Sequence, residues 1–447
     1  MLLNFRTKNF KSFKNGFDLS LRPSAIKDLK DSVLVSKLTN EKEVRALSSS
    51  VIYGPNAAGK TSLLESIYYF QNIILSGGLI EKDNILLSNG KTISLVPFMY
   101  DSYNEPIEFE IEFEENKNIY KYGLKINVGK FADFDFEKYI SEEYLSINEK
   151  EIFKRNETEL LINYKKLDNN FLNEGFESKI FGNYLRIMTN NLEKNKLFLS
   201  TDFSSFVSKS LYNIIYNWVA NKLIVFMNFN ELKYSMAADN KEIINLPKEL
   251  YDAVYKIGVI GSELTYKKSN ENENDIKLFS NIKINDKQTI MIPSKLIESF
   301  GTLKFIDLFP AVVIALVKGG TLIIDELDNG LHPMVIRSII NIFHDRDINR
   351  KNAQLIFNTH NPIYLNFNCF RRDEICFVEK DEETKSSELY KLSDFKTNSE
   401  NPIRNTTDYV NGYFKNKFGA IEYVDLSDVC EVIMNQIEES ENGQKSN

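Results

Sequence analysis

Eight residues near the N-terminus, GPNAAGKT, have the types and spacing that bind a chain of phosphates. They follow the β-branched run SSSVIYG and precede apolar residues at helical spacing, so we expect a loop between a buried strand and a helix. Glycines let such a loop curl until its N–H groups point inward at an anion. We expect Lys60 to contact the β- and γ-phosphates of ATP, and Thr61 to bind Mg²⁺. The predicted nucleotide-binding residues are Gly54, Pro55, Asn56, Ala57, Ala58, Gly59, Lys60, Thr61 and Ser62.

A second segment, TLIIDE at 321–326, places two carboxylates after four apolar residues. The apolar run predicts a buried parallel strand, and ligands of open α/β sheets bind at the carboxyl ends of strands. We expect Asp325 to hold Mg²⁺ and Glu326 to act as general base on the attacking water. Strands ending in Asp-Glu are frequent by chance, so this prediction gains its weight from the phosphate loop.

His360 stands in THNP, at the end of the predicted strand 353–360. A single histidine is more often a structural residue than a catalytic one. Its place after a strand favours a role in donating a hydrogen bond to the γ-phosphate or in positioning the water.

Before a long predicted helix lies ESFGT, in which Ser299 and Gly301 precede or open the helix. A helix N-terminus with a serine and a glycine can bind an anion. We expect this site to cover the γ-phosphate held by Lys60 of a second copy; the alternative is an ordinary helix start.

The segment DNGLHP begins at Asp328, two residues after Glu326. We expect it to cross the interface between two copies and to couple their sites. The alternative is a turn that leads into the helix predicted at 334–344.

Strands and helices alternate around these motifs, which predicts an α/β fold with a parallel core sheet covered on both faces. EFEIEF at 108–113 and YKYGLKINV at 120–128 alternate apolar and polar residues, which predicts an antiparallel hairpin with one solvated face. A core helix is expected at about 302–317.

The region between the two groups of motifs is rich in Lys, Asn and Glu, and we predict a mainly helical insertion, with 206–226 as its clearest helix. The predicted organisation is a first half of the head at 1–140, the insertion or arm at 141–290, a second half of the head at 291–425, and a short helix with a flexible tail at 426–447.

Composition excludes little. The chain has 447 residues, 43% of them hydrophobic, and a formal net charge of −8, which does not indicate nucleic-acid binding although a local basic face is compatible with it. Three separated cysteines predict free thiols in a reducing compartment. We expect neither a signal peptide nor a membrane span, and a cytoplasmic protein.

The motifs in this order resemble the ABC-type AAA ATPases of the OLD, RecF and SMC kind, over roughly 1–130 and 290–420. The most similar type is the stand-alone ATPase subunit of bacterial abortive-infection and restriction-linked systems, the AbiL/RloA type. The resemblance rests on NFKSF (9–13), GPNAAGKT, VPF (96–98), ESFGT, TLIIDELDNGLHP, NTHNP, RRDEICFVEKD (371–381) and YFKNKFGAIEY (413–423).

This resemblance implies a P-loop NTPase fold with an ABC-ATPase-like head and an antiparallel lobe, and it places Lys11 near the phosphates. It also implies hydrolysis of ATP to ADP and phosphate, a homodimer or higher oligomer closed by ATP, and a separate nuclease or toxin effector in defence against phage.

There are departures from the family. The signature is usually LSGGQ, and the departure to ESFGT predicts slow turnover. The Q-loop has no evident counterpart, and Gln71 is expected to be exposed on the first helix. The segment after Cys376 is too short for the nuclease domain of OLD proteins, so we predict no nuclease site. Two alternatives stay open: a DNA-repair or chromosome-maintenance ATPase that clamps DNA, and a scaffold that holds ATP without turnover.

Overall fold

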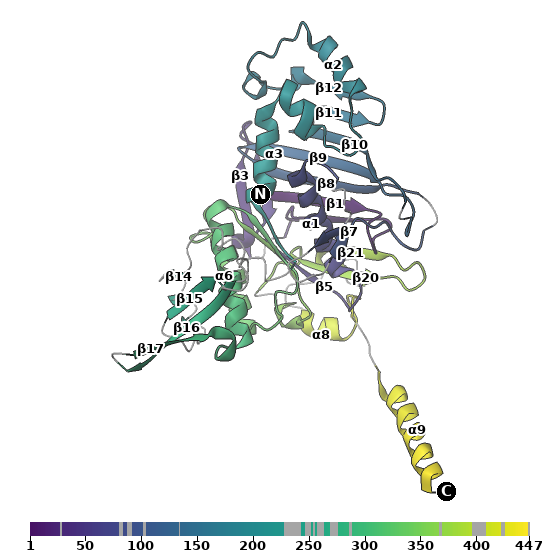
Figure 1. Ribbon diagram of the computed structural model, residues 1–447, viewed down its shortest axis with the longest axis vertical. Helices are drawn as coiled ribbons and strands as arrows, with labels where there is room; N and C mark the ends of the chain where they lie inside the picture. The colour runs from purple at the N-terminus through teal and green to yellow at the C-terminus, as the bar shows by residue number, and fades with distance from the viewer. Residues whose placement is uncertain are drawn as a thin grey trace.

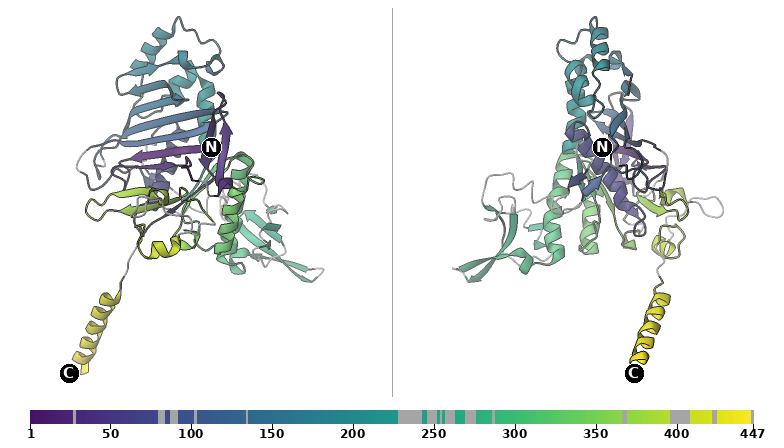
Figure 2. Two further views of the ribbon diagram at one scale, coloured as in Figure 1. Left: turned by 180° about the vertical axis from the view of Figure 1, so that it is seen from behind. Right: turned by 45° about the vertical axis from the view of Figure 1, so that its right-hand side comes forward.

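A parallel sheet and an antiparallel sheet, with helix α1 between them, form the head of the chain in this computed structural model (Figure 1). Further strands and helices extend the antiparallel sheet at one end, and a small four-stranded sheet lies beside helix α6 (Figures 1 and 2). The structure describes residues 1–447 except 27–28, 80–83, 87–91, 102–103, 134, 228–242, 246–251, 254, 257–262, 269–275, 286–287, 366–368, 396–407, 422–424 and 446–447.

The core sheet has the order β13-β18-β19-β5-β20-β21, and all pairs are parallel except β20 with β21. Successive side chains of a strand point to opposite faces. Ile323 therefore packs in the cluster around α1, while its neighbours Leu322 and Ile324 pack in the cluster around α6 and α7. The predicted α/β P-loop fold is confirmed. The core strands are β5 (Ser49–Tyr53), β13 (Leu223–Phe226), β18 (Thr321–Ile324), β19 (Gln354–Asn358), β20 (Ile375–Lys380) and β21 (Ser387–Lys391).

The antiparallel sheet has the order β12-β11-β10-β9-β8-β1-β2. Its central hairpin is the predicted one: β8 and β9 pair with Phe109 opposite Leu124, and Phe109 packs against Phe70 of α1. The charged residues of β8 alternate with these and face outward, where Glu110 and Glu112 form ion pairs. The strands are β1 (Leu2–Lys8), β2 (Phe17–Ser20), β8 (Ile107–Glu115), β9 (Asn118–Asn127), β10 (Tyr139–Ile147), β11 (Lys150–Asn156) and β12 (Leu160–Ile162).

Three helices carry or flank the predicted motifs: α1 (Lys60–Ser76), α6 (Phe300–Lys318) and α7 (Pro333–His344). By length and composition α6 could also cross a membrane, with a mean hydropathy of 1.9 over 18 residues. In this fold 44% of that window is buried, and the helix packs on the core sheet through side chains such as Leu308 and Val312.

The prediction that 141–290 is mainly helical is wrong for the part that the structure describes. Its first strands extend the antiparallel sheet, and its last part forms a separate antiparallel sheet, β14-β15-β16-β17. At both ends of β16 apolar and polar residues alternate, as in IKL and IKIN, and this period of two is typical of a strand. The elements here, after β10 to β12, are α2 (Phe181–Asn190), α3 (Lys209–Asn221), β14 (Ile243–Asn245), β15 (Glu263–Lys268), β16 (Ile276–Asn285) and β17 (Gln288–Pro293).

The helix predicted at 206–226 is shorter than expected. α3 begins after its cap Ser208, whose hydroxyl accepts from the N–H of Leu211 at 3.1 Å, and it ends at Asn221. The next residues, Leu223–Phe226, are the strand β13, which pairs in parallel with β18. LIVF is short and apolar with β-branched Ile224 and Val225 at its centre, so burial against a neighbouring strand decides its conformation.

The remaining elements are peripheral to the nucleotide motifs. At the C-terminus α9 extends away from the head, and every residue from 427 to 437 is exposed (Figures 1 and 2). The bounds are β3 (Val33–Lys37), β4 (Glu43–Leu47), β6 (Asn84–Leu86), β7 (Thr92–Ser94), α8 (Tyr409–Phe414) and α9 (Ser427–Lys445).

Candidate functional site

The loop GPNAAGKT lies between β5 and α1, as the sequence predicts. Gly59 caps α1 with φ 114°, and Ala57 has φ 58°, so the loop backbone is left-handed at both positions. A Cβ on Gly59 would lie 2.6 Å from Oγ of Ser12 and 2.8 Å from Oγ of Ser387. Glycine is therefore required at this point by the backbone and by close neighbours.

Lys60 is buried, and its ammonium group lies inside the loop. Nζ donates to the carbonyl oxygens of Gly54 and Pro55, each at 2.8 Å. These carbonyl oxygens accept hydrogen bonds from Nζ that phosphate oxygens would accept in a P-loop with bound nucleotide. The cation is thus held at the N-terminus of α1, where both the charge and the helix dipole favour an anion.

Two stretches of chain separated by the insertion meet at Asp325. The hydroxyl of Thr61 donates to Oδ1 of Asp325 at 3.2 Å, and the amide of Asn358 donates to the same oxygen at 2.5 Å. Parallel strands β5, β18 and β19 deliver these residues to one sheet edge. Burial raises the pKa of Asp325 to about 6, although the hydrogen bonds oppose the shift.

The residues at this edge fit Mg²⁺. A carboxylate and a hydroxyl are hard oxygen ligands, and a carboxylate whose charge is penalised by burial gains most from a dication. Within the described residues no three His, Cys, Asp or Glu side chains gather into a metal site. That is typical of Mg²⁺ sites, which use one or two protein oxygens together with phosphates and water.

Glu326 follows directly, and its backbone is held at both ends. Its N–H donates to the side-chain oxygen of Asn358, and its carbonyl accepts from Nζ of Lys304 at 2.9 Å. Its φ is 52°, in the left-handed region that a glutamate rarely adopts. The two contacts stabilise that conformation, and the residue itself is exposed. A carboxylate presented in this way can reach a water molecule.

Lys304 is a cation that the sequence did not single out. It projects from α6 and is 5% exposed. Burial lowers its pKa to about 8, while the charges of Asp328, Glu326 and Asp325 oppose that shift. Lys304 therefore joins the helix that follows ESFGT to the acidic end of β18.

His360 and Asp328 lie beside each other. The backbone N–H of His360 donates to Oδ2 of Asp328 at 3.2 Å, and both follow strands at the edge that carries Asp325. The His360 side chain is exposed. Further along DNGLHP, His332 caps α7 and accepts from the N–H of Met334 at 3.2 Å.

The segments ESFGT and DNGLHP pack closely on each other. A Cβ on Gly301 would lie 2.5 Å from the carbonyl of Gly330, and one on Gly330 would lie 2.3 Å from the ring of Phe300. Ser299 caps α6 and accepts from the N–H of Thr302 at 3.1 Å. Among the described residues no hydrogen bond joins Ser299 or Gly301 to the phosphate loop of the same chain.

Lys11 lies beside α1, where Nζ pairs with Glu65 at 2.5 Å. Gln71, predicted to be exposed, is buried instead. Its amide donates to the carbonyls of Val219 at 3.1 Å and Leu223 at 2.5 Å, so it joins α1 to the junction of α3 and β13. The prediction failed because the partner is a backbone that the sequence placed within a continuous helix.

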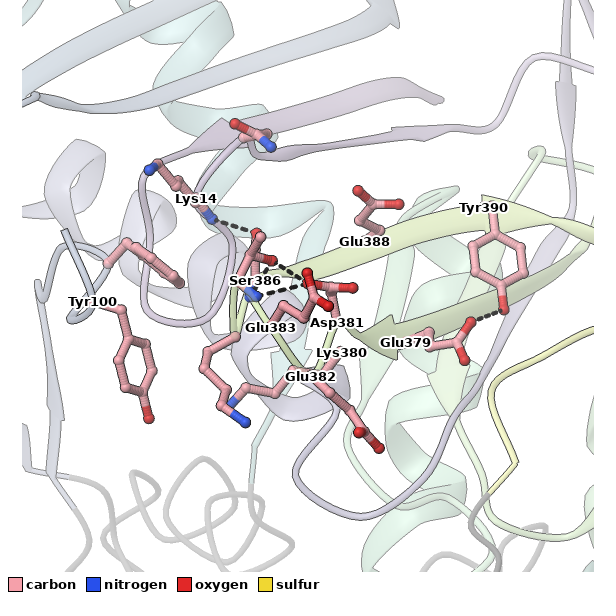
Figure 3. Close-up of a pocket in the computed structure, with 14 residues that line it drawn as sticks. Lys14, Tyr100, Glu379, Lys380, Asp381, Glu382, Glu383, Ser386, Glu388 and Tyr390 are labelled. Atoms are coloured by element: carbon pink, nitrogen blue, oxygen red, sulfur yellow. Dashed lines mark hydrogen bonds between the residues drawn. The ribbon is translucent and has the colours of Figure 1, made fainter.

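An open cavity of about 1250 Å³ is lined by residues near Lys14, by Phe98 and Tyr100, and by residues between 379 and 390 (Figure 3). Its wall contains Lys14 and Ser386, joined by a 3.3 Å hydrogen bond from the Lys14 N–H to the Ser386 hydroxyl. The next residue, Ser387, donates its hydroxyl to the carbonyl of Ala58 at 2.5 Å. The other polar walls carry both signs of charge, with Lys380 and Lys385 beside a larger number of acidic residues. The acidic residues are Glu379, Asp381, Glu382, Glu383 and Glu388.

Asn358, Lys304 and Ser387 are the site residues that sequence reasoning missed. Asn358 stands inside the quoted motif NTHNP, so its position after a core strand was a usable signal. Nothing in the sequence marks Lys304 or Ser387, because their roles depend on contacts with residues far away in the chain.

Comparison with solved structures finds similarity to the SMC head domain from Thermotoga maritima, with 13% sequence identity and a TM-score of 0.36, over 87% of this chain and 98% of that chain. No curated protein matches the sequence. A family model described as "AAA domain, putative AbiEii toxin, Type IV TA system" matches residues 49–366, which is well over half of the chain and includes every motif from the phosphate loop to NTHNP. The chain therefore belongs to this family of AAA-domain P-loop proteins.

Proposed function

We propose that the chain is an ATP-binding and ATP-hydrolysing switch subunit. The observation that carries the proposal is the meeting of Thr61 and Asp325, with Lys60 and Glu326 beside them. Lys60 would exchange the carbonyls of its own loop for the β- and γ-phosphates. Thr61 and Asp325 would hold Mg²⁺, which when bound neutralises charge on the phosphates.

The hydrolytic step would use Glu326 as general base. Its carboxylate takes a proton from water as the water oxygen attacks the γ-phosphorus, and the bond to the β-phosphate oxygen breaks to give ADP and phosphate. Asn358 and Lys304 hold the backbone of Glu326, so they act as positioning residues. His360, on the same edge, would orient the water or donate to the γ-phosphate. The cavity of Figure 3 would receive the base and sugar.

We also propose that two copies close on ATP. Ser299 and Gly301, which make no hydrogen bond to their own phosphate loop among the described residues, would cover the γ-phosphate of the second copy. Exposed apolar side chains beside them support an interface: Leu296 is 75% and Phe300 is 65% exposed. Asp328 would lie at the same junction.

The biological part of the proposal is control of a separate effector, a nuclease or toxin, in bacterial defence against phage. Its support is the description of the family, which names a toxin and a toxin–antitoxin system, together with the order of motifs. Closing and opening of the pair would be the signal that the effector receives.

Phosphate release from ATP tests the chemistry. Glu326→Gln keeps the shape of the side chain and removes the base, so we expect turnover at least about 100-fold below wild type with ATP affinity retained. Lys60→Ala should lose ATP binding. Gln288→Glu, a change of equal size on the distant strand β17, is the control and should keep wild-type turnover. Equal rates for wild type and Glu326→Gln would rule out Glu326 as the base.

A further inference from the structure

The small sheet β14-β15-β16-β17 lies against α6 through one of its faces (Figure 1). In the pairing of β15 with β16, Leu264 lies opposite Ser280. Tyr266 lies opposite Leu278, two residues further along, so all four side chains share one face. Leu264 and Tyr266 pack in the same buried cluster as Phe305 of α6. Among the residues that the structure describes, no strand of the small sheet pairs with the core sheet, so the sheet meets the head through α6.

A buried chain of hydrogen bonds joins this face to the segment ESFGT. Oγ of Ser280 donates to Oε1 of Glu298 at 3.0 Å, and it lies 2.7 Å from Oγ of Ser294. A hydroxyl has one proton, so Ser294 is the donor in the second contact. Ser280 and Ser294 are fully buried, and Glu298 is 7% exposed. Loss of one member of such a buried network leaves its partner unsatisfied, which costs more than the bond itself contributes.

The chain between β17 and Ser299 is a short hydrogen-bonded turn. Its five residues begin with the 3-10 turn η6 (Ser294–Leu296), and the N–H of Glu298 donates to the carbonyl of Ser294 at 2.8 Å. Ser299 then caps α6. A displacement of β16 or β17 is therefore passed on to Ser299 and Gly301 across a structured turn.

A second contact joins the same face of the small sheet to the body of α6. The hydroxyl of Tyr266 is hydrogen-bonded to Asp307, and burial together with this neighbouring carboxylate raises the pKa of Tyr266. One turn earlier in the helix, Lys304 donates to the carbonyl of Glu326. Polar side chains of α6 therefore contact both the small sheet and the acidic end of β18.

We propose that the small sheet regulates the nucleotide site, and that Ser280 and Tyr266 are the positioning residues through which it acts. They set the place of the first turn of α6 through Glu298 and Asp307. The inference rests on the proposed function, in which that turn covers the γ-phosphate of a second copy. Coupling between two sites is reciprocal. A shift of the small sheet changes the affinity of the ATP-closed pair, and closure on ATP in turn restrains the small sheet.

ATP-dependent dimerisation of the full chain, in the presence of Glu326→Gln, tests the positioning role. Ser280→Ala removes the hydroxyl that joins the small sheet to Glu298, so the affinity of dimerisation should fall at least about tenfold. ATP affinity at the phosphate loop, measured where the chain is monomeric, should stay within about twofold of the parent.

Thr265→Val is the matched control. Thr265 is also a buried hydroxyl of the small sheet, but it points to the opposite face, where it accepts from the amide of Asn281 at 3.1 Å. This variant should dimerise as the parent does. Equal dimerisation of Ser280→Ala and the control overturns the positioning role. Tyr266→Phe keeps the ring and removes only the bond to Asp307, so it gives the same test if Ser280→Ala does not fold, with an expected loss of about threefold or more.

Hydrogen exchange in β16 and β17 separates this inference from the proposed function. In Glu326→Gln chains, ATP and Mg²⁺ should slow amide exchange there at least about threefold, and Ser280→Ala should abolish the effect at equal ATP occupancy. If ATP yields no dimers but still slows this exchange, the ATP-closed pair is wrong and the coupling to the nucleotide site stands. ATP-driven dimers with unchanged exchange keep the closed pair and overturn the regulation. Neither dimers nor a change in exchange overturns both.

Discussion

Asp325 carries a charge that its surroundings penalise when no cation is present. It lies at the end of a buried strand, and burial raises its pKa to about 6 from an ordinary 3.8. Below the lower value the side chain is neutral in both the folded and the unfolded chain. Between the two values the unfolded chain ionises while the folded chain keeps its proton on this partly buried carboxyl, so the stabilising contribution is lost as the pH rises to the folded pKa.

This predicts a pH-dependent effect of Asp325→Asn in the protein free of nucleotide and metal. At pH 8 the variant should be more stable than wild type by about 1–3 kcal/mol in urea unfolding, because asparagine has no charge to bury. The difference should disappear as the pH falls below about 4, where Asp325 is protonated in both states.

The exposed Asp31 provides the matched control. Its side chain is 82% exposed, so Asp31→Asn should show no comparable gain at pH 8. A stability difference for Asp325→Asn that stays constant from pH 4 to pH 8 would contradict the account of Asp325 as a penalised charge.

At the residue level the sequence predicted which motifs meet, but not the residues that support them. Lys60, Thr61 and Asp325 belong to motifs whose spacing is fixed by phosphate and metal geometry, and the structure brings them together. Lys304 supports Glu326 through a contact between two segments that only the fold places side by side. Such contacts have no local pattern, and the same holds for the buried amide of Gln71.

The first turn of α6 is the element that links ESFGT to DNGLHP. Gly301 is required there because the carbonyl of Gly330 would lie 2.5 Å from an added Cβ, and backbone at that distance cannot yield as a flexible side chain can. We predict that Gly301→Ala displaces this turn. Nucleotide binding at the phosphate loop should persist, whereas the affinity of ATP-dependent dimerisation should fall about tenfold or more. Light scattering measures the dimerisation, in chains that also carry Glu326→Gln so that ATP is not consumed.

Gly182→Ala is a close control. Gly182 is also the second residue of a helix and also follows a phenylalanine, but an added Cβ would meet nothing within 4 Å. It should leave dimerisation unchanged. If both variants dimerise as wild type does, the turn at Gly301 takes no part in the interface.

Helices and strands with a clear periodicity of apolar residues were predictable from the sequence, and short buried strands were not. The β8–β9 hairpin and α7 match their patterns because one face of each is solvated and the alternation is visible. β13 has four apolar residues and follows α3 after a single residue. A run of this length fits a helix or a strand equally well, and here the pairing with β18 decides.

At the scale of the whole molecule, the proposed pair has sites made from both copies, and mixing inactive chains tests this. Lys60→Ala lacks ATP binding at its own loop, and Ser299→Arg lacks the covering residue. Each alone should be inactive. Random mixing puts half the chains in mixed pairs, each with one complete site, so about a quarter of the wild-type ATPase rate should return.

Two outcomes of the mixing experiment would contradict this prediction. Mixed samples that stay as inactive as the separate variants, although mixed pairs form in sedimentation, would show that each site is completed within one chain. Recovery in the mixture together with activity of Ser299→Arg alone would remove Ser299 from the site.

The core sheet of the head depends on β13, a strand that the insertion contributes. A deletion designed from the sequence, joining 140 to 291, would take away the strand that pairs with β18 as well as the outer strands of the antiparallel sheet. The strand β18, which leads to Asp325, would then be the outermost strand of the core sheet, and its unpaired backbone groups would be open to aggregation. A shortened version of this protein must therefore keep residues up to Phe226, and the small sheet β14-β15-β16-β17 is the part of the insertion that can be removed without unpairing β18.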